Sequence, residues 1–360
     1  MNNENNKNFL KKILIKIIAG NKSSEKELNK LFSIILENNI PEIYISSILV
    51  ALATKGETSE EIYCLVKSIT KNAIKIKPNV KKSITDTCGT GGDKLNSFNI
   101  STAAAIVSSS SGCVVAKHGN RSSSGICGSA DFLEFIGFNL STEPEKISKT
   151  IEQLGIGFLF APKFHPALKK FSKMRRDLGV KTIFNIAGPL SNPCINIRNQ
   201  IIGVYEPDLI RKILHVSKKM KRDVMVLHSD IGMDELSNAG KNQIFYLKNG
   251  KTSKIEISLN ELGIKKIDIR KLIVKSKEES VKLTLESIYG NAPQEIIDIV
   301  VLNSAASLVV SKTVKSFKEG VEISKEVIKQ ELARKKLKDL IDNCGDRKKL
   351  YEIENRFKLT

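Results

Sequence analysis

The first 75 residues show apolar positions at the three- and four-residue spacing of amphipathic helices. One stripe consists of Leu10, Ile13, Leu14, Ile17 and Ile18, and the next of Leu28, Leu31, Phe32 and Ile35. Helix-start signals agree with this pattern. Ser24 and Thr58 each precede a glutamate by three residues, as in a capping box, and Pro41 suits the first turn of a helix that ends at Gly56. The pattern predicts a small all-helical domain over residues 1–80.

From about Ser83 the pattern changes to short β-rich runs that alternate with helices. The candidate strands are Ile84–Thr87, Val114–Ala116, Gln200–Tyr205 and Val224–Leu227, and a helix at Asp208–Met220 separates the last two. Such alternation predicts a larger α/β domain with a mainly parallel central sheet flanked by helices. Asn249 and Gly250 stand between two further runs, 243–247 and 255–257, and predict a hairpin that adds an antiparallel edge.

The helical and α/β patterns are interleaved along the chain. Pro166–Asn192 is helical at first and then rich in Gly, Pro and Asn, and we expect about 166–195 to return to the helical domain. The α/β domain then consists of residues 81–165 and 196–360. A chain of 360 residues is long enough for two such domains.

Composition narrows the class of protein. The net charge of +19 raises the question of nucleic-acid binding, but the excess is diffuse: residues 1–82 carry 14 Lys/Arg against 8 Asp/Glu, and residues 311–360 carry 14 against 9. Because the charge is diffuse, we do not expect nucleic acid as a partner. The apolar stretch Ile296–Val310 is interrupted by Asp298 and Asn303, so we do not expect a membrane as a partner either. Six cysteines without a C-x-x-C pair, and no signal peptide, predict a cytoplasmic protein with reduced thiols.

A glycine-rich turn, Asp86–Asp93, follows the first candidate strand and precedes a helix start at Asn99–Ala105. Such a turn lets backbone N–H groups approach phosphate oxygens, and the helix N-terminus adds a favourable dipole. The turn lacks the Gly-Lys-Ser/Thr of a Walker A loop and the third glycine of G-x-G-x-x-G. It predicts anion binding, with a purely structural turn as the alternative.

A second polar loop, Lys117–Gly125, also follows a strand and leads into Gly128–Asp131. Lys117 and Arg121 supply positive charge, while Asn120 and three consecutive serines supply neutral donors, which suits a polyphosphate held at several oxygens. A solvated polar loop is the alternative. Two such loops in one domain favour a shared ligand.

Two further segments carry charged side chains suited to a substrate. Asp234 and Glu235 follow the strand that ends near His228, and beside phosphates they would need a divalent cation, for which Mg²⁺ fits the all-oxygen ligands. Arg175 and Arg176 are candidates for bidentate recognition of a carboxylate, and His165 could line the same pocket. The alternatives are a solvated acidic turn and surface arginines.

Taken in order, these segments resemble the anthranilate phosphoribosyltransferase family over nearly the whole chain. The shared motifs are Cys-Gly-Thr-Gly-Gly-Asp, Asn-Ile-Ser-Thr, Lys-His-Gly-Asn-Arg, Gly-Ser-Ala-Asp, Arg-Arg-Asp-Leu-Gly, Gly-Pro-Leu-Ser-Asn-Pro and Gly-Met-Asp-Glu. The resemblance implies a nucleoside phosphorylase/phosphoribosyltransferase-like fold and a homodimer. It also implies Mg²⁺-dependent transfer of phosphoribose from phosphoribosyl pyrophosphate to the amine of anthranilate, in tryptophan biosynthesis.

The same resemblance implies the site residues. Phosphoribosyl pyrophosphate would be bound by Gly89, Gly92, Asp93, Ser97, Asn99, Ile100, Ser101, Thr102, Lys117, His118, Gly119, Asn120, Arg121, Ser122, Ser123, Ser124, Gly125 and Ser129. Ser101, Asp234 and Glu235 would hold Mg²⁺, and Gly89, Asn120 and Arg175 would contact anthranilate. We expect Arg175, Asn120 and His118 to be catalytic, with Arg175 orienting the anthranilate carboxylate and His118 accepting a proton.

The chain departs from the family pattern at two places, Ser97 where Thr is common and Ile126-Cys127 where Lys or Ser is usual. Two alternatives share the architecture. A pyrimidine nucleoside phosphorylase-like enzyme has no use for the Arg175 segment together with the acidic pair. A non-enzymatic nucleic-acid-binding relative would cluster its Lys and Arg residues.

Overall fold

The computed structural model describes residues 2–37, 40–91, 95–122 and 125–359. The chain divides into two compact units, one of residues 1–74 and 162–193 and the other of residues 75–161 and 194–360. Each unit is described by itself. The predicted fold class, a small all-helical domain and a larger α/β domain with a mainly parallel sheet, is confirmed.

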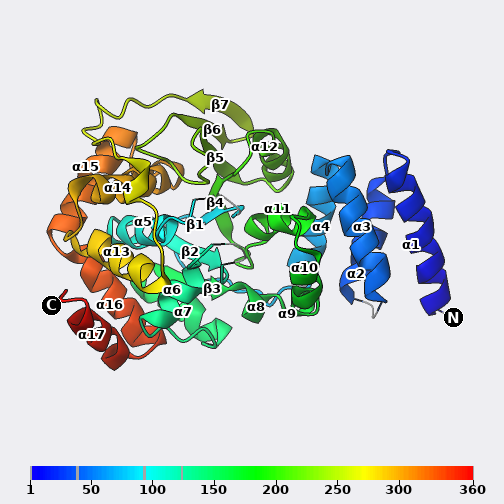
Figure 1. Cartoon of the computed structure of the whole chain (residues 1–360), viewed down its shortest axis with the longest axis horizontal. Helices are drawn as coiled ribbons and strands as arrows, with labels where there is room; N and C mark the ends of the chain where they lie inside the picture. Colours follow the sequence, from blue (N-terminus) through cyan, green and yellow to red (C-terminus); the bar gives the residue numbers. More distant parts are fainter. Residues whose placement is uncertain (1, 38–39, 92–94, 123–124, 360) are drawn as a thin grey trace. The chain divides into compact units, whose positions relative to one another are not determined.

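The helical unit begins with four helices, α1 (Asn2–Ile18), α2 (Glu25–Glu37), α3 (Glu42–Lys55) and α4 (Ser59–Lys71), shown in blue in Figure 1. Both predicted capping boxes form: Glu27 N donates to Ser24 Oγ at 3.3 Å and Glu61 N to Thr58 Oγ1 at 3.2 Å. The second apolar stripe is fully buried. The first is only partly so, because Ile18 at the end of α1 is 70% exposed.

The segment that begins at residue 161 adds four short helices, α8 (Ala161–Phe164), α9 (Pro166–Lys169), α10 (Ser172–Leu178) and α11 (Ile183–Leu190). Within the helical unit α10 packs against α3, and α11 packs against α3 and α4. The stacked rings of Phe171 and Phe184, with centroids 5.5 Å apart, join this returning segment internally.

The α/β unit is built on one seven-stranded sheet of order β3-β2-β1-β4-β5-β6-β7. The first five strands in chain order are parallel: β1 (Ile84–Gly89), β2 (Val114–Gly119), β3 (Ile156–Phe160), β4 (Ile197–Gly203) and β5 (Asp223–Ser229). The four strands expected from the sequence lie in β1, β2, β4 and β5, whereas β3 was not predicted. Since β1 continues to β2 on one side and pairs with β4 on the other, the strand order reverses at β1, which is where open α/β sheets bind ligands.

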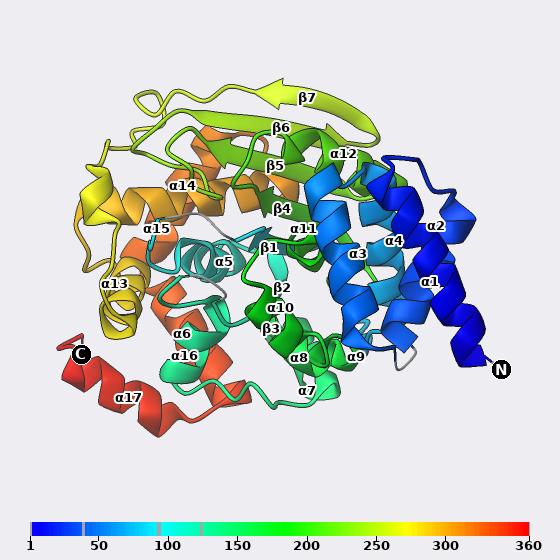
Figure 2. The same cartoon turned by 45° about the vertical axis from the view of Figure 1, so that its right-hand side comes forward.

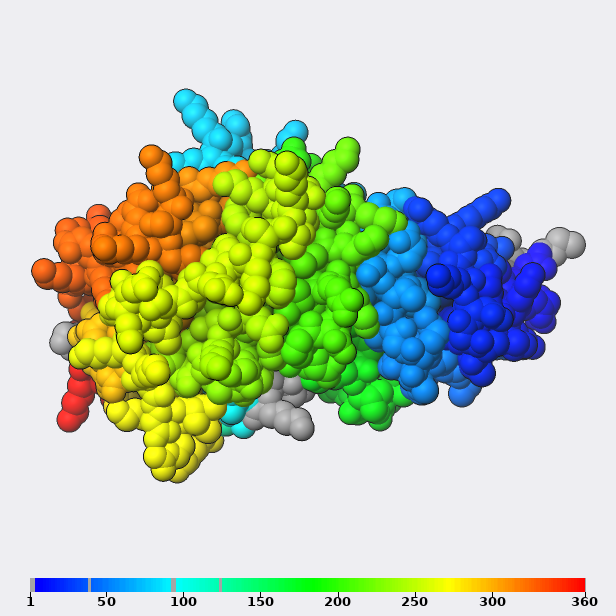
Figure 3. All heavy atoms as spheres, turned by 90° about the horizontal axis from the view of Figure 1, so that it is seen from above, coloured from blue at the N-terminus to red at the C-terminus, as the bar shows by residue number. Residues whose placement is uncertain are grey.

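The predicted hairpin forms an antiparallel edge of β6 (Asn242–Lys248) and β7 (Lys251–Ile255). Its second strand begins earlier than expected, because Asn249 and Gly250 both take positive φ, 50° and 78°, and so make a two-residue turn. Figure 3 shows the segment after β7, in yellow-green, on the outer surface of this unit.

Helices cover the sheet. α5 (Ile100–Ser110) packs on β1 and β2 and against α14 (Gln294–Val310), while α7 (Pro144–Leu154) packs on β3 and α12 (Leu209–Lys219) on β5 (Figure 2). The remaining helices are α6 (Ser129–Phe135), α13 (Lys277–Tyr289), α15 (Phe317–Lys329), α16 (Leu332–Cys344), α17 (Arg347–Arg356) and a short 3-10 turn at Ile269–Lys271. Among the described residues, no helix has by itself the length and apolar character of a membrane span; α13 and α14 pass that test only as a pair bent by 76°.

Candidate active site

Two hydrogen bonds fix the glycine-rich turn after β1, one to the end of β4 and one to the loop after β5. Thr90 N donates to the Gly203 carbonyl at 2.9 Å, and Gly91 N donates to Asp234 Oδ2 at 2.8 Å. There is no room for side chains here, because a Cβ on Gly89 would overlap the Asp234 carboxylate and one on Gly203 would overlap the Asp234 main-chain oxygen. Glycine at both positions therefore lets Asp234 reach the carboxyl end of β1.

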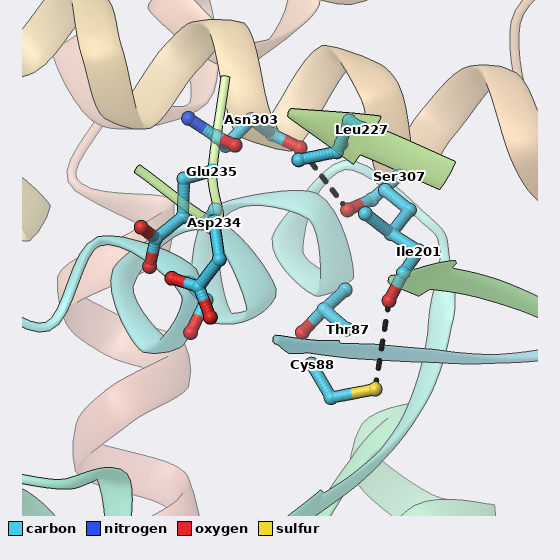
Figure 4. A pocket seen from close by; sticks show the side chains of 10 residues that line it. Thr87, Cys88, Ile201, Leu227, Asp234, Glu235, Asn303 and Ser307 are labelled. Atoms are coloured by element: carbon cyan, nitrogen blue, oxygen red, sulfur yellow. Dashed lines mark hydrogen bonds between the residues drawn. The ribbon is translucent and has the colours of Figure 1, made fainter. Parts of the chain in front are cut away.

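Asp234 and Glu235 face a narrow pocket that Ser101 at the start of α5 also lines. In Figure 4 the two carboxylates lie next to each other, beside the end of β1. The structure thus brings together the three predicted magnesium ligands, from the loop after β5 and from α5. Carboxylate and hydroxyl oxygens are hard ligands that suit Mg²⁺.

The start of α5 places a helix N-terminus at this pocket. Asn99 precedes the helix and is turned toward α13, since its backbone N donates to Thr284 Oγ1 and its side-chain Nδ2 to Ser280 Oγ, both at 3.2 Å. Ser97 forms an isolated bridge with Ile273. Thr102 lies in the interior, where its hydroxyl has no hydrogen-bond partner among the described residues. The direct roles of Asn99 and Thr102 toward a ligand stay predictions.

Lys117, on β2, reaches across to β1 and α5. Its Nζ donates to the Thr87 carbonyl at 2.5 Å and lies 3.3 Å from Thr87 Oγ1 and from Ser101 Oγ. The side chain is buried, and burial lowers the pKa of its ammonium, an effect that the nearby Asp86 carboxylate opposes. A buried cation therefore stands beside Ser101 and the acidic pair.

The loop after β2 is folded onto the first turn of α6. A Cβ on Gly119 would overlap Ser129 Oγ, and Ser129 Oγ donates to the Asn120 carbonyl at 3.3 Å. Asp131 closes this loop, because its Oδ2 accepts from Ser122 N at 2.9 Å and Gly128 N at 3.0 Å.

Arg121 was predicted to bind phosphate, and the structure gives its guanidinium two carboxylate neighbours. It donates to Glu134 at 2.7 and 2.8 Å and to Asp131 at 3.1 Å. These contacts raise the pKa of Arg121 and lower that of Glu134. Arg121 therefore anchors the base of the loop in this structure, and its contact with a substrate stays a prediction.

Four predicted site residues, Gly92, Asp93, Ser123 and Ser124, lie outside the described residues. Ser122 and Gly125 flank two of these residues, and Gly125 N donates to Ser122 Oγ at 2.7 Å.

Two of the predicted residues, His165 and Arg175, belong to the helical unit. Arg175 is on α10 with its guanidinium 5.5 Å from the ring centroid of Phe184, and burial lowers its pKa. His165 is 2% exposed, and burial lowers the pKa of its imidazole to about 4. His165 is therefore neutral at pH 7.

This buried imidazole makes the helical unit sensitive to acid. An unfolded histidine has a pKa near 6.5, so the unfolded chain binds the proton first as the pH falls, and stability is lost below that value. Between pH 7.5 and pH 5 we expect a loss of about 2 kcal/mol from His165 alone. Urea unfolding at both pH values, compared with His165→Gln, checks this. A variant as acid-sensitive as the natural chain would contradict it.

The structure adds pocket residues that the sequence did not single out. Asn303 and Ser307, one turn apart on α14, line the pocket with Thr87 and Cys88. Asn303 holds the acidic loop, because its Oδ1 accepts from Leu236 N at 3.0 Å and its Nδ2 donates to the Leu236 carbonyl at 2.8 Å. The sequence did carry a signal, because Asn303 and Ser307 are among the few polar positions in the largely apolar stretch 296–310.

Comparisons with known proteins agree with this arrangement. Residues 81–334 match the a/b domain of a glycosyl transferase family, and residues 11–73 match the helical bundle domain of that family. The chain is 40% identical over 331 residues to the anthranilate phosphoribosyltransferase of Petrotoga mobilis. The matched region covers 91% of this chain and 95% of that protein.

Solved structures give the same result. The crystal structure of anthranilate phosphoribosyltransferase from Thermus thermophilus is 31% identical, with a TM-score of 0.85 over 92% of this chain and 98% of that one. The Saccharomyces cerevisiae enzyme, in complex with PRPP and Mg, is 26% identical, with a TM-score of 0.83 over 93% and 97%. With its paired carboxylates beside a glycine-rich turn and with these likenesses, the chain belongs to the anthranilate phosphoribosyltransferase family.

Proposed function

We propose that this protein transfers the phosphoribosyl group of phosphoribosyl pyrophosphate to the amine of anthranilate, giving N-(5-phosphoribosyl)anthranilate and pyrophosphate, in tryptophan biosynthesis. One observation carries the proposal: Ser101, Asp234 and Glu235 line one pocket at the carboxyl end of β1, and Lys117 bonds to Ser101 beside it. A helix N-terminus and a buried ammonium suit the phosphates. The proposed enzyme is a cytoplasmic homodimer that binds neither nucleic acid nor membrane.

The acidic pair explains why a cation belongs to the proposal. Two carboxylates beside a diphosphate would repel it, so Ser101, Asp234 and Glu235 would hold Mg²⁺, which when bound neutralises charge on the leaving diphosphate. The protein's own part is to fix these ligands. Gly91 N–H and the Asn303 side chain hold the acidic loop from its two sides.

The chemistry of the substrates sets what the remaining residues do. As the bond from C1 of the ribose to pyrophosphate breaks, negative charge grows on the leaving group, and Lys117 and the N–H groups at the start of α5 would stabilise it. The aromatic amine is already neutral at pH 7, so attack needs no strong base. Orientation matters more, and can supply about 7–11 kcal/mol of the barrier.

The reaction itself is tested by anthranilate fluorescence. We expect the signal to decay when phosphoribosyl pyrophosphate and Mg²⁺ are added, and to stay constant with a chelator in excess. Persistent fluorescence in the presence of both would contradict the proposal. Phosphorolysis of a pyrimidine nucleoside, or salt-dependent binding of single-stranded DNA without turnover, would favour one of the two alternative functions instead.

Arg175 is expected to orient anthranilate by its carboxylate. Replacing it with alanine removes a charged hydrogen-bonding partner worth about 2 kcal/mol, so the anthranilate KM should rise about 30-fold. The KM for phosphoribosyl pyrophosphate should change little. Steady-state kinetics with each substrate varied in turn measure both values.

The adjacent, exposed Arg176 offers a matched control, since Arg176→Ala removes the same charge from the same helix. An anthranilate KM unchanged in Arg175→Ala, or raised equally in both variants, would show that Arg175 has no specific role.

A further inference from the structure

The two central strands that carry the proposed phosphate loops pair over only part of their length. Within these described strands, β1 pairs with β2 at Ile84 with Val114 and at Thr85 with Val115, and no further. On its other side β1 stays paired with β4 through to Gly89. The ends of β1 and β2 that point at the pocket therefore lack a shared backbone ladder.

Two side chains connect the strands where the ladder stops. Asp86 on β1 accepts the His118 N–H through Oδ1 at 3.0 Å, and Lys117 on β2 donates to the Thr87 carbonyl at 2.5 Å. The bonds are reciprocal: each strand sends one side chain to the main chain of the other. Together they set the position of the Lys117–Asn120 segment relative to the glycine-rich turn.

Asp86 is also held from β4. It is fully buried, and its Oδ2 accepts from Gln200 Nε2 at 3.3 Å. Gln200 Oε1 in turn accepts from Arg222 Nη1 at 2.8 Å, so the carboxylate ends a chain of hydrogen bonds that begins just before β5 and passes through β4 to β1. Burial lowers the pKa of Arg222 to about 10, and the nearby Asp86 charge opposes this. A buried carboxylate with cations on both sides is costly to move or to neutralise.

We propose that Asp86 is a positioning residue for the binding of phosphoribosyl pyrophosphate. It holds the His118 N–H and balances the Lys117 charge, and so keeps the loop after β2 at the distance from the glycine-rich turn that the diphosphate needs. The proposal rests on the proposed function. Asp86 is not among the residues that line the pocket, so it acts through the residues that it holds.

The test is Asp86→Asn, which keeps the size of the side chain and removes its charge. We expect the KM for phosphoribosyl pyrophosphate to rise about 10-fold, with kcat and the anthranilate KM changed less than about threefold. Gln200→Met, which removes one partner of the carboxylate, should raise the same KM about threefold. This second variant keeps the proposal testable if Asp86→Asn folds poorly.

Asp298 provides a matched control in the same unit. It is also fully buried, and it accepts from Lys265 N at 2.7 Å and Gln294 Nε2 at 2.9 Å, away from the pocket residues. Asp298→Asn should lower the melting temperature as much as Asp86→Asn while leaving the KM for phosphoribosyl pyrophosphate unchanged. An unchanged KM in Asp86→Asn, or an equal rise in Asp298→Asn, would overturn the proposal.

Measuring the binding of phosphoribosyl pyrophosphate by calorimetry tests this proposal separately from the proposed function. If the natural chain binds it without turning over anthranilate, the proposed function fails, and a dissociation constant about 10-fold higher in Asp86→Asn still supports the role of Asp86. If the natural chain does not bind it, both proposals fail.

Discussion

Replacing Gly203 with alanine is expected to reduce kcat/KM by at least about 100-fold, because the new methyl group must displace the main chain that carries Asp234. Gly203 ends β4, and its Cβ would overlap the Asp234 main-chain oxygen. Backbone cannot move aside as the far end of a side chain can. The Thr90 N–H bond to the Gly203 carbonyl links the same displacement to the glycine-rich turn.

The variant should also be destabilised, by about 1–3 kcal/mol for an overpacked core position. Gly320→Ala controls for this effect, since its Cβ would lie 3.0 Å from Ala305 on α14 and outside the pocket lining. We expect Gly320→Ala to lower the melting temperature while keeping kcat/KM within about threefold of the natural value. Comparable losses of kcat/KM in both variants would mean that Gly203 matters only for stability.

The fold class could be predicted because local patterns and tertiary packing agree over most of the chain. The capping boxes at Ser24 and Thr58 and the Asn249-Gly250 turn depend on residues close in sequence, and all three form. The strand β3 was missed since its five residues follow a helix directly and show no alternation of polar and apolar positions. Ile18 belongs to the first apolar stripe and is nevertheless exposed, because periodicity does not show where a helix stops packing.

The candidate site could be predicted in part, for a different reason. The predicted magnesium ligands Ser101, Asp234 and Glu235 came from motifs, and they share a pocket because parallel strands end at the same edge of the sheet. No motif in the sequence indicated the side chains that position another residue. Asp86 is far from Gln200 in sequence, and only the pairing of β1 with β4 brings the two together.

Contacts with neighbours also distinguish residues of similar chemistry in one motif. Lys117 and Arg121 are both cations in the second loop, yet Lys117 is buried beside Ser101 whereas Arg121 is exposed and paired with Glu134. Their side chains therefore make different contacts, one beside the pocket and one at the base of the loop. Sequence alone treats them as equivalent phosphate ligands.

Asp234→Asn removes the charge of Asp234, whereas the Gly203 variant changes its position. Asparagine retains an oxygen that can accept the Gly91 N–H, so the turn should keep its shape while one negative charge of the acidic pair is lost. We expect kcat/KM to fall by about 10²–10³, as for other groups that stabilise charge in a transition state, and the Mg²⁺ concentration for half-maximal rate to rise about tenfold. Magnesium titrations of the fluorescence assay measure both effects.

The same substitution at Asp230 separates loss of this charge from general effects on the loop. Asp230 precedes Asp234 in the loop after β5, is exposed, and accepts from Lys241 N at 2.8 Å, a bond that asparagine can also make. Asp230→Asn should therefore retain the magnesium dependence of the natural chain. If Asp234→Asn also retained it, with activity reduced only slightly, the acidic pair would not be holding the cation, because a ligand that loses its charge must bind Mg²⁺ less tightly.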